Sequence, residues 1–395
     1  MEHASHHRAL VIGAGHSGLA AAQALKAKNI DVTILEARDQ VADPWRARHP
    51  QLRLNIHRKF AELPGHPLTR QDGPFITRDT VIDYIEGYAK HVGVPIKFNT
   101  SVERIHKTLG GWEVETNRGV YLTEHLIIAT GSQKTPDIPD WPGKDSFRGE
   151  ILHSAHLGDV RRFEGRKVLV IGAGNSGTDV LNHLAGVYAQ RIWVSLRHGP
   201  TIIPTWLLGI PMHRMANVFA MISPPVLDRL LGLTQRLVYG DLTKYGLRSH
   251  PTGAATRMAT EGVTPALDNG FVRALKRGKM RIVEETKRFD GTNVVLKDGQ
   301  VIDPDVVICA TGYRSDLEPV FGDLDVMNDY GHPRHGTGQK DLQNPGLWFT
   351  GFGVTFQGYF YAARVAANRI ADSIAASSQG APKRPQVTKQ LECLH

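Results

Sequence analysis

Cysteine is nearly absent from this chain: only Cys309 and Cys393 occur among its 395 residues. A disulfide framework and a zinc site with Cys-x-x-Cys spacing are therefore excluded, and we expect no metal site. The two cysteines are also too far apart in the sequence to form the close redox-active pair of a disulfide reductase. So little cysteine suits a reducing compartment, and we expect a cytoplasmic protein.

Long apolar runs are missing as well. The longest, Thr201 to Met212, is interrupted by Pro204 and Pro211, and it falls short of the roughly 20 apolar residues that cross a membrane. The opening segment, Met1 to Arg8, lacks the hydrophobic core of a signal peptide. We therefore expect neither a transmembrane segment nor export from the cell.

Runs of basic residues are the third absence. Lys and Arg outnumber Asp and Glu by 47 to 39, which gives a formal net charge of +8, yet they are scattered along the chain. A nucleic-acid partner is therefore not expected, because a polyanionic cofactor or an acidic substrate explains the charge just as well. The length and the 41% hydrophobic content suffice for two domains.

Two segments, residues 9–36 and 167–197, resemble each other. In both, an apolar β-branched run meets glycines, and a helical stretch and a second apolar run follow. Such β-α-β units build a doubly wound sheet, so the expected fold class is α/β, with two Rossmann-like dinucleotide-binding domains. Two more strand-like runs, Leu126 to Ile128 and Val306 to Ile308, each precede an Ala-Thr-Gly that marks a crossing between the domains.

In the first unit, Gly13, Gly15 and Gly18 lie between a strand and a helix. Glycines at this spacing allow a tight turn and let a pyrophosphate sit against the helix N-terminus. Glu36 closes the second strand of the unit. Its carboxylate would accept hydrogen bonds from ribose hydroxyls and repel a 2′-phosphate, so this unit is predicted to bind FAD or NAD.

The second unit repeats the glycines as Gly172, Gly174 and Gly177, but Ser195 and Arg197 stand where the acidic residue would be. A guanidinium pairs bidentately with a phosphate, so this unit is predicted to bind the 2′-phosphate of NADPH, a plain surface arginine being the alternative. Two sites of opposite preference indicate electron transfer from NADPH to a flavin. Without a close cysteine pair, oxygen becomes the leading electron acceptor.

The segment between the two units reads Phe147-x-Gly149-x-x-x-His153-Ser154, and Lys244-Tyr245-Gly246-Leu247 lies ahead of Thr264-Pro265. These motifs and the Ala310-Thr311-Gly312-Tyr313 linker resemble the class B flavin-containing monooxygenases, most closely the YUCCA-type (indole-3-pyruvate) enzymes and their bacterial relatives. The resemblance covers about residues 8 to 375. Where the family's fingerprint ends in an aromatic residue, this chain has Leu157. For His153, a packed linker histidine is favoured over a general base.

The segment Leu52 to Gly65 resembles the family's flavin-side loop. The resemblance assigns Asn55 to holding the oxygenated flavin and the substrate, with a turn-forming asparagine as the alternative. A side-chain amide donates to a flavin peroxide without being acidic enough to expel hydrogen peroxide. His57 and Arg58 would either bind a substrate carboxylate or remain solvated. Trp45-Arg46 is also family-like, although Asp43-Pro44 replaces the two glycines common before the tryptophan.

The segment Leu347 to Gly353 resembles the part of the family fold that returns to the FAD domain and closes over the flavin, and Gly351 permits close backbone approach there. Gln357, Tyr359 and Phe360 are expected in the substrate pocket or, for the two aromatic residues, in core packing. The Leu-rich stretch Val226 to Val238 is expected either in a helical insert over the active site or in ordinary core helices.

The resemblance implies an FAD- and NADPH-dependent monooxygenase that forms a flavin hydroperoxide and transfers one oxygen atom to a small organic substrate. An aryl 2-oxo acid such as indole-3-pyruvate, oxidatively decarboxylated, is the substrate implied by the YUCCA similarity. Alternatives are N- or S-oxygenation of a soft nucleophile, Baeyer–Villiger oxidation of a ketone, an uncoupled NADPH oxidase and a non-catalytic redox sensor. The oligomeric state is open, and a homodimer is one possibility.

The expected domains are an FAD-binding part (1–158), an NADPH-binding domain (159–304) with a helical insert at about 200–262, an FAD-binding return segment (305–378) and a disordered tail (379–395). Asn55 is the catalytic candidate. The candidates for cofactor binding are Gly13, Gly15, Gly18, Glu36, Arg38, Trp45, Arg46, Val102, Ala129, Thr130, Gly131, Gly172, Gly174, Asn175, Ser176, Gly177, Ser195, Arg197, Thr311, Gly312, Gly351 and Phe352.

Overall fold

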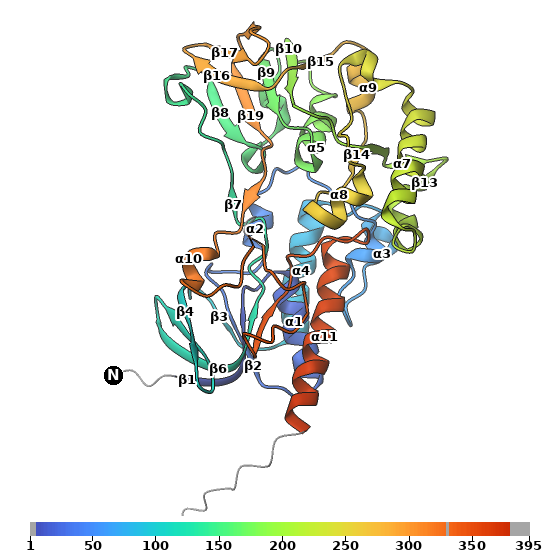
Figure 1. Ribbon diagram of the computed structural model, residues 1–395. Helices are drawn as coiled ribbons and strands as arrows, with labels where there is room; N and C mark the ends of the chain where they lie inside the picture. Colours follow the sequence, from blue (N-terminus) through green and yellow to red (C-terminus); the bar gives the residue numbers. More distant parts are fainter. Residues whose placement is uncertain (1–4, 329–331, 380–395) are drawn as a thin grey trace, which may run out of the picture.

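The structure is a computed structural model that describes residues 5–328 and 332–379. Two sheets form its two halves, one at the bottom and one at the top of Figure 1. Of the tail expected to be disordered, residues 379–395, only the first residue lies within the described residues. Within the described ranges, no helix combines the length and the apolar character that crossing a bilayer requires.

The first sheet has the order β3-β2-β1-β6-β5-β4, and β21 pairs with the end of β6. Its β1, β2, β3, β6 and β21 are paired in parallel, whereas β4, β5 and β6 form an antiparallel meander. The strands are β1 (Ser5–Ile12), β2 (Val32–Leu35), β3 (Ile96–Lys97), β4 (Val102–Thr108), β5 (Gly111–Thr116), β6 (Gly119–Ile128) and β21 (Leu347–Phe349). A strand from the C-terminal part of the chain thus completes a sheet begun at the N-terminus.

Three long helices cover this sheet: α1 (His16–Ala27), α4 (Arg78–Val92) and α11 (Tyr359–Gln379), with α1 packed against both others. The sequence of α4 explains its ends and its face. Thr77 caps its first turn by accepting from Thr80 N, Gly93 ends it in the left-handed conformation, and its buried residues recur at helical spacing. Short helices lie nearby at α2 (Asp43–Arg46), α3 (Arg58–Ala61) and α10 (Glu318–Phe321).

The second sheet is wholly parallel, in the order β15-β10-β9-β19-β8. Its central strands are buried apolar runs, as expected for strands covered on both faces. The strands are β8 (Glu150–His153), β9 (Lys167–Ile171), β10 (Arg191–Ser195), β15 (Met280–Val283) and β19 (Val306–Cys309), accompanied by α5 (Asn175–Leu184), α9 (Phe271–Lys276) and an antiparallel sheet of β16 (Thr286–Asp290), β17 (Asn293–Leu296) and β18 (Val301–Ile302).

Two strands differ from the expected domain boundaries. β8 was expected in the first part of the FAD domain and β19 in its return segment, yet β19 pairs with both β9 and β8 in the second sheet. An apolar strand sequence does not indicate which sheet receives it, which explains the difference. We propose that the second unit runs from about β8 to about β19.

The chain crosses between the halves through two paired linkers. β7 (Thr135–Pro136) and β20 (Tyr313–Arg314) form a short antiparallel ladder, and Figure 1 shows β7 between the two sheets. Ala-Thr-Gly precedes each linker, after β6 and after β19. The structure therefore brings the two chain crossings side by side.

An insert follows β10 and lies beside the second sheet, at the right in Figure 1. It contains strands β11 (Ile202–Pro204), β12 (Trp206–Leu207), β13 (Ile210–Pro211) and β14 (Ala266–Asp268), and helices α6 (Ala216–Phe219), α7 (Pro224–Tyr239) and α8 (Ala254–Glu261). Leu227 and Leu231 of α7 pack into a small core with Ala254 and Ala255. Short 3-10 turns occur at Arg70–Asp72, Lys144–Ser146, Ser154–His156, Val160–Phe163, Met212–Met215 and Leu242–Tyr245.

Candidate active site

The loop between β1 and α1 has the geometry of a dinucleotide cradle. Gly13 has a φ of +103°, and a Cβ there would lie 2.9 Å from the Ala129 carbonyl oxygen. A Cβ at Gly18 would lie 1.9 Å from the Gly13 oxygen, so only glycine lets α1 pack this closely. A Cβ at Gly15, the N-cap of α1, would meet nothing within 4 Å. The helix N-terminus is therefore open to a phosphate.

Glu36 lies at the end of β2 beside this cradle. Its Oε2 accepts from Ala14 N at 2.7 Å, and its Oε1 accepts from Arg38 N at 2.9 Å. Each carboxylate oxygen keeps a lone pair for a further donor, as a ribose-binding acid requires. The Arg38 side chain points to solvent and pairs with Asp43.

Three buried polar atoms near the cradle lack a partner within the described chain: Ser17 Oγ, Thr130 Oγ1 and Arg46 Nη1. An unsatisfied buried polar atom costs about 1–3 kcal/mol, so these atoms indicate a polar ligand. Gly351 has a φ of +83°, and a Cβ there would lie 2.8 Å from Ser17 Oγ. The C-terminal segment thus closes against α1, and the residues of this half fit a bound FAD.

The remaining candidates around the first cradle have mixed surroundings. Trp45 and Arg46 lie on α2, and Arg46 forms an ion pair with Glu86. Val102 begins β4 and is partly buried. The Phe352 ring packs in the core against Phe349. Only the backbone of Phe352 is therefore free to face a ligand.

The loop between β9 and α5 repeats the cradle. A Cβ at Gly172 would lie 2.6 Å from the Ala310 oxygen, and one at Gly177 would lie 2.1 Å from the Gly172 oxygen. A Cβ at Gly174, the N-cap of α5, would meet nothing within 4 Å. In each half, the alanine carbonyl of an Ala-Thr-Gly motif, Ala129 or Ala310, thus packs against the first glycine of the cradle.

Ser195 and Arg197, the two residues expected to bind a 2′-phosphate at the end of β10, have different surroundings. Arg197 is 75% exposed and holds Glu285 at 3.5 Å, so its guanidinium is free to turn to an anion. Ser195 is buried, donates to the Glu284 carbonyl at 2.9 Å and accepts from Thr286 N. The structure therefore does not bring the Ser195 hydroxyl to the cofactor surface, because these hydrogen bonds hold it against residues 284–286 inside the second unit.

The other candidates of the second unit tie the linkers and the insert together. Asn175 donates its side-chain amide to Thr264 Oγ1, and Ser176 follows it in the first turn of α5. Thr311 donates to the Asp137 carbonyl, and the Gly312 carbonyl accepts from Asp137 N. Thr311 and Gly312 therefore fix the pairing of the two crossings.

Asn55 lies in an exposed loop beside the N-terminal end of α11. Its side chain makes no hydrogen bond within the described residues, whereas Leu54 and Ile56 are buried on either side. A Cβ at Gly358, which directly precedes α11, would lie 2.5 Å from Ile56. The amide is therefore free at the junction of the flavin-side loop and the returning segment.

A cavity of about 420 Å³ adjoins this loop, lined by His57, Arg58, Lys59, Glu62, Leu68, Arg70 and Arg214. Four of these seven side chains are permanently charged cations, against one carboxylate. Burial, Arg58, Arg214 and Lys59 hold the pKa of His57 below its ordinary value. The cavity suits an anion, and it unites His57 and Arg58 with Arg214, a residue from the insert that the sequence did not single out.

Near the start of α11, Gln357 donates to Asn217 Oδ1 at 3.2 Å and so joins the insert to the returning segment. Phe360 is 2% exposed and stacks on His16 at 4.3 Å between ring centroids. Tyr359 bonds to Ser132 and Gln133, just before β7. Phe360 is thus a core residue, and Gln357 and Tyr359 connect separate segments.

His153 lies where the two linkers meet, and both of its ring nitrogens are engaged. Nε2 donates to the Gly312 carbonyl at 2.9 Å, and Nδ1 accepts from Ala155 N at 3.1 Å. Burial lowers the pKa of His153. Because neither nitrogen is free, His153 is a packed linker histidine and not a general base. Leu157 is fully buried in the neighbouring core.

Arg48 is a residue of this junction that the sequence did not reveal. It donates to the Tyr313 hydroxyl, and its guanidinium lies 4.7 Å from the centre of the Tyr313 ring. Burial lowers the pKa of Arg48. The only sequence signal was its place after Trp45-Arg46, because the contact with Tyr313 spans 265 positions.

Two glycine cradles on two Rossmann-type sheets, joined by paired linkers, define a flavoprotein oxidoreductase that uses a nicotinamide cofactor. Residues 10–200 match the family model of the pyridine nucleotide-disulphide oxidoreductases. Cys309, the cysteine within the described residues, is fully buried, and burial raises the pKa of its thiol to about 12. That thiol is therefore not a reactive redox group.

Curated relatives define the family more closely. The chain is 31% identical over 389 residues to "Probable indole-3-pyruvate monooxygenase YUCCA8" of Arabidopsis thaliana, with 95% of this chain and 90% of the relative covered. It is 34% identical to "Indole-3-pyruvate monooxygenase YUCCA1" of Oryza sativa subsp. japonica, covering 78% of this chain and 77% of that one. A solved flavin-containing monooxygenase from Stenotrophomonas maltophilia shares the fold, with a TM-score of 0.69 at 23% identity over 95% of this chain and 99% of that one.

The chain belongs to the YUCCA-type family of flavin-containing monooxygenases. It is an FAD- and NADPH-dependent monooxygenase that acts on a small molecule and molecular oxygen. The expected family, fold class and cofactors are thereby confirmed.

Proposed function

We propose that this monooxygenase oxidatively decarboxylates an aryl 2-oxo acid, with indole-3-pyruvate as the first candidate. The basic cavity beside the flavin-side loop carries this proposal, because it offers cations to a substrate carboxylate. The names of the curated relatives, indole-3-pyruvate monooxygenases, support it. In the overall reaction, the 2-oxo acid, O₂, NADPH and a proton give the shortened carboxylic acid, CO₂, NADP⁺ and water.

FAD, when bound and reduced by NADPH, supplies the electrons that activate oxygen. The chain's own residues bind, orient and shield. The cradle at Gly13 to Gly18 and Glu36 would hold the FAD, and the cradle at Gly172 to Gly177 with Arg197 would hold the NADPH. Arg58 and Arg214 would orient the substrate carboxylate. The segment returning at Gly351 would exclude water from the reacting groups.

Asn55 has a separate proposed role. Its free amide at the flavin-side loop would donate a hydrogen bond to the oxygen being transferred, without supplying a proton that releases hydrogen peroxide. The same amide also suits the second candidate reaction, N- or S-oxygenation of a soft nucleophile. That reaction needs no recognition of a substrate carboxylate. The two reactions therefore differ in their dependence on the cationic cavity.

The test begins with the FAD-loaded protein, reduced by NADPH without oxygen and then mixed with oxygen and indole-3-pyruvate. We expect indole-3-acetic acid to form in proportion to the NADPH consumed, with little hydrogen peroxide. In Arg214→Ala the KM for the 2-oxo acid should rise while flavin reduction by NADPH stays unchanged. Arg229→Ala, an exposed arginine on α7 outside the cavity, is the matched control.

Three outcomes would overturn the proposal. Peroxide equal to the NADPH consumed, with every substrate offered, would mean an uncoupled oxidase. Turnover of neutral sulfides or amines but not of 2-oxo acids would mean heteroatom oxygenation. Equal KM values in Arg214→Ala and Arg229→Ala would remove the cavity from substrate binding.

We also propose that the enzyme is a cytoplasmic homodimer. The low cysteine content supports the location. Four apolar residues of α7, Val226, Leu230, Leu233 and Leu237, are exposed and recur at alternating spacings of four and three. This spacing forms one stripe along a helix, and a stripe of that kind packs against its own copy in a two-fold pair. The same helix uses Leu227 and Leu231 for its own core, so the stripe is a second apolar face.

A further inference from the structure

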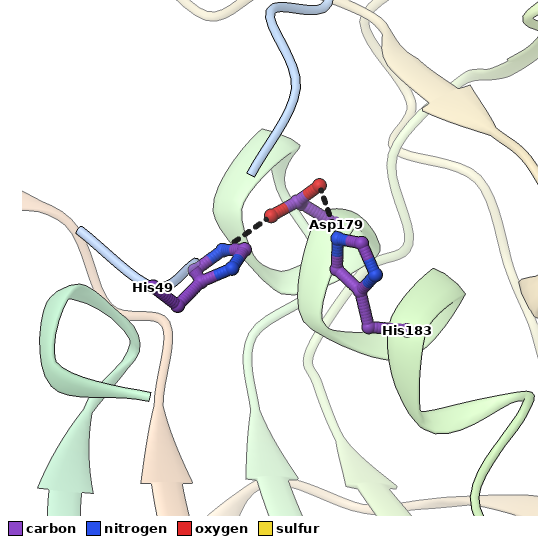
Figure 2. A group of neighbouring side chains, drawn as sticks. All are labelled: His49, Asp179 and His183. Carbon is purple, nitrogen blue, oxygen red and sulfur yellow. Dashed lines mark hydrogen bonds and ion pairs between the residues drawn. The ribbon is translucent and has the colours of Figure 1, made fainter. Parts of the chain in front are cut away.

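His49, Asp179 and His183 form a compact polar cluster between the two halves of the molecule (Figure 2). The Asp179 carboxylate lies between the two rings, 2.9 Å from His49 Nε2 and 3.5 Å from His183 Nε2. The ligand atoms of all three side chains lie within 4.8 Å of one another. None of the three residues belongs to the cofactor cradles or to the basic cavity.

The residue types and their spacing suit a divalent metal. Asp179 and His183 are one helical turn apart on α5, so they point from the same face of a rigid element. His49 approaches from a different segment of the chain, as Figure 2 shows, and this segment follows α2 of the first half. Two imidazole nitrogens and one carboxylate oxygen are a ligand set that Zn²⁺ uses when its fourth position holds water or substrate.

The surroundings supply both a rigid ligand and an entry path. His49 is 5% exposed, and its Nδ1 is buried without a partner in the described residues. Asp179 and His183 have side chains that are 31% and 25% exposed. Tetrahedral ligands at about 2.0–2.2 Å from a shared zinc ion lie about 3.3–3.6 Å from one another. The 3.5 Å pair of His183 and Asp179 fits this spacing, and the 2.9 Å pair of His49 and Asp179 has to open slightly. The two partly exposed side chains have the freedom to make that small adjustment around an ion.

We infer that His49, Asp179 and His183 bind a zinc ion that ties the flavin half of the enzyme to the nicotinamide half. To bind the ion through Nε2, each imidazole must be neutral and carry its proton on Nδ1. His49 lies three positions after α2, which carries Trp45 and Arg46, whereas α5 opens at the Gly174 end of the second cradle. An ion bound here therefore links the two elements that flank the two cofactors.

The experiment uses the FAD-loaded protein, freed of metals with a chelator and dialysed to equilibrium against micromolar Zn²⁺. Bound zinc is measured by mass spectrometry and expressed per FAD, so that only folded, loaded protein is counted. We expect His49→Asn and His183→Asn each to bind one zinc ion fewer per chain than the unsubstituted protein. Zinc should also raise the Tm of the unsubstituted protein and leave that of both variants unchanged.

Two controls separate this site from other histidines. His106→Asn is the matched change, because exposed His106 also pairs with a carboxylate, Glu115 at 3.2 Å, but far from α5. His6→Asn with His7→Asn covers two of the three histidines near the N-terminus. Both controls should bind as much zinc as the unsubstituted protein. Equal zinc in His183→Asn and in the controls, or no zinc in the unsubstituted protein, would overturn the inference.

Discussion

Arg197 is the exposed cation at the end of β10 that we assign to the 2′-phosphate of NADPH. Its ion pair with Glu285 is a surface pair of little strength, so binding a phosphate does not require breaking a strong contact. Hydrogen bonds to a charged group contribute about 1.5–3 kcal/mol. Arg197→Ala should therefore raise the KM for NADPH by roughly 10- to 100-fold and leave the KM for NADH nearly unchanged, as steady-state kinetics with each cofactor will show.

The matched control is Arg191→Ala, an exposed arginine at the opposite end of the same strand. It should leave both KM values unchanged. An Arg197→Ala enzyme that weakens NADPH and NADH equally would contradict the assignment, because the phosphate distinguishes the two cofactors.

His16 makes the fold sensitive to acid. It lies in the first turn of α1, partly buried and with its Nε2 atom inaccessible to solvent, and burial lowers its pKa to about 4 from the ordinary 6.5. The unfolded chain takes up this proton below pH 6.5 and the folded chain does not until about pH 4. The contribution of His16 to the free energy of unfolding is therefore fully present above pH 6.5, and it is lost as the pH falls from 6.5 towards 4.

The predicted loss from His16 alone is about 3 kcal/mol of unfolding free energy across that window. Urea unfolding at several pH values should show a smaller acid loss in His16→Phe than in the unsubstituted protein. His106→Asn removes an exposed histidine and should leave the acid loss as it is. Identical pH profiles for all three proteins would show that His16 does not cause it.

At the scale of elements, α8 depends on a carboxylate from its neighbour α7. Asp228 accepts from Ala255 N at 2.6 Å with one oxygen and from Thr256 N at 3.3 Å with the other. The N-cap of α8 is Gly253, which offers no side-chain cap, and a Cβ there would lie 2.1 Å from the Asp228 carboxyl carbon. Asp228 thus performs the capping function from outside the helix.

Asp228→Ala should lower the local stability of α8 by about 1–2 kcal/mol, because the orphan N–H groups lose their acceptor. Hydrogen exchange of the first-turn amides of α8 should then be faster, while exchange in the first sheet is unaffected. Arg229→Ala, the neighbouring exposed residue on α7, should leave exchange in α8 unchanged. Protection in α8 that survives Asp228→Ala would contradict the capping role.

The elements that could be predicted from the sequence are those defined by local pattern. Both β-α-β units, their glycines and the acid Glu36 follow from residues close together in the chain. The pairing of β19 between β9 and β8 does not, because its partners lie more than a hundred positions earlier. Ser195 was placed at the cofactor surface because the pattern identified its strand but not the direction of its side chain.

For the candidate site the limit was again distance along the chain. Arg48 meets Tyr313 across 265 positions, and His49 meets Asp179 across 130. The basic cavity joins the flavin-side loop to Arg214 of the insert. Local sequence patterns contain no signal for contacts between positions this far apart in the chain. Each residue type alone was nevertheless compatible with its role.

At the scale of the whole molecule, the apolar stripe of α7 predicts a dimer. Leu233 is 55% exposed at the middle of the stripe. Leu233→Glu should place two charges against each other in a two-fold pair and convert the dimer to a monomer. Light scattering on a gel-filtration column measures the mass directly.

Leu109→Glu is the control, since Leu109 is fully exposed at the turn between β4 and β5, on the other half of the molecule. It should leave the dimer intact. An unsubstituted protein that is monomeric at high concentration would contradict the dimer. So would a Leu233→Glu protein that keeps the dimeric mass.

The short ladder between β7 and β20 has a consequence for how such a chain is assembled and altered. Because Pro136 and Tyr313 are register partners, the point where the chain leaves the flavin half and the point where it re-enters are neighbours. Everything between them is a cassette whose two ends already meet, and exchanging it for a related cassette does not stretch the remainder. Such an exchange would let one flavin scaffold take its electrons from a different nicotinamide donor.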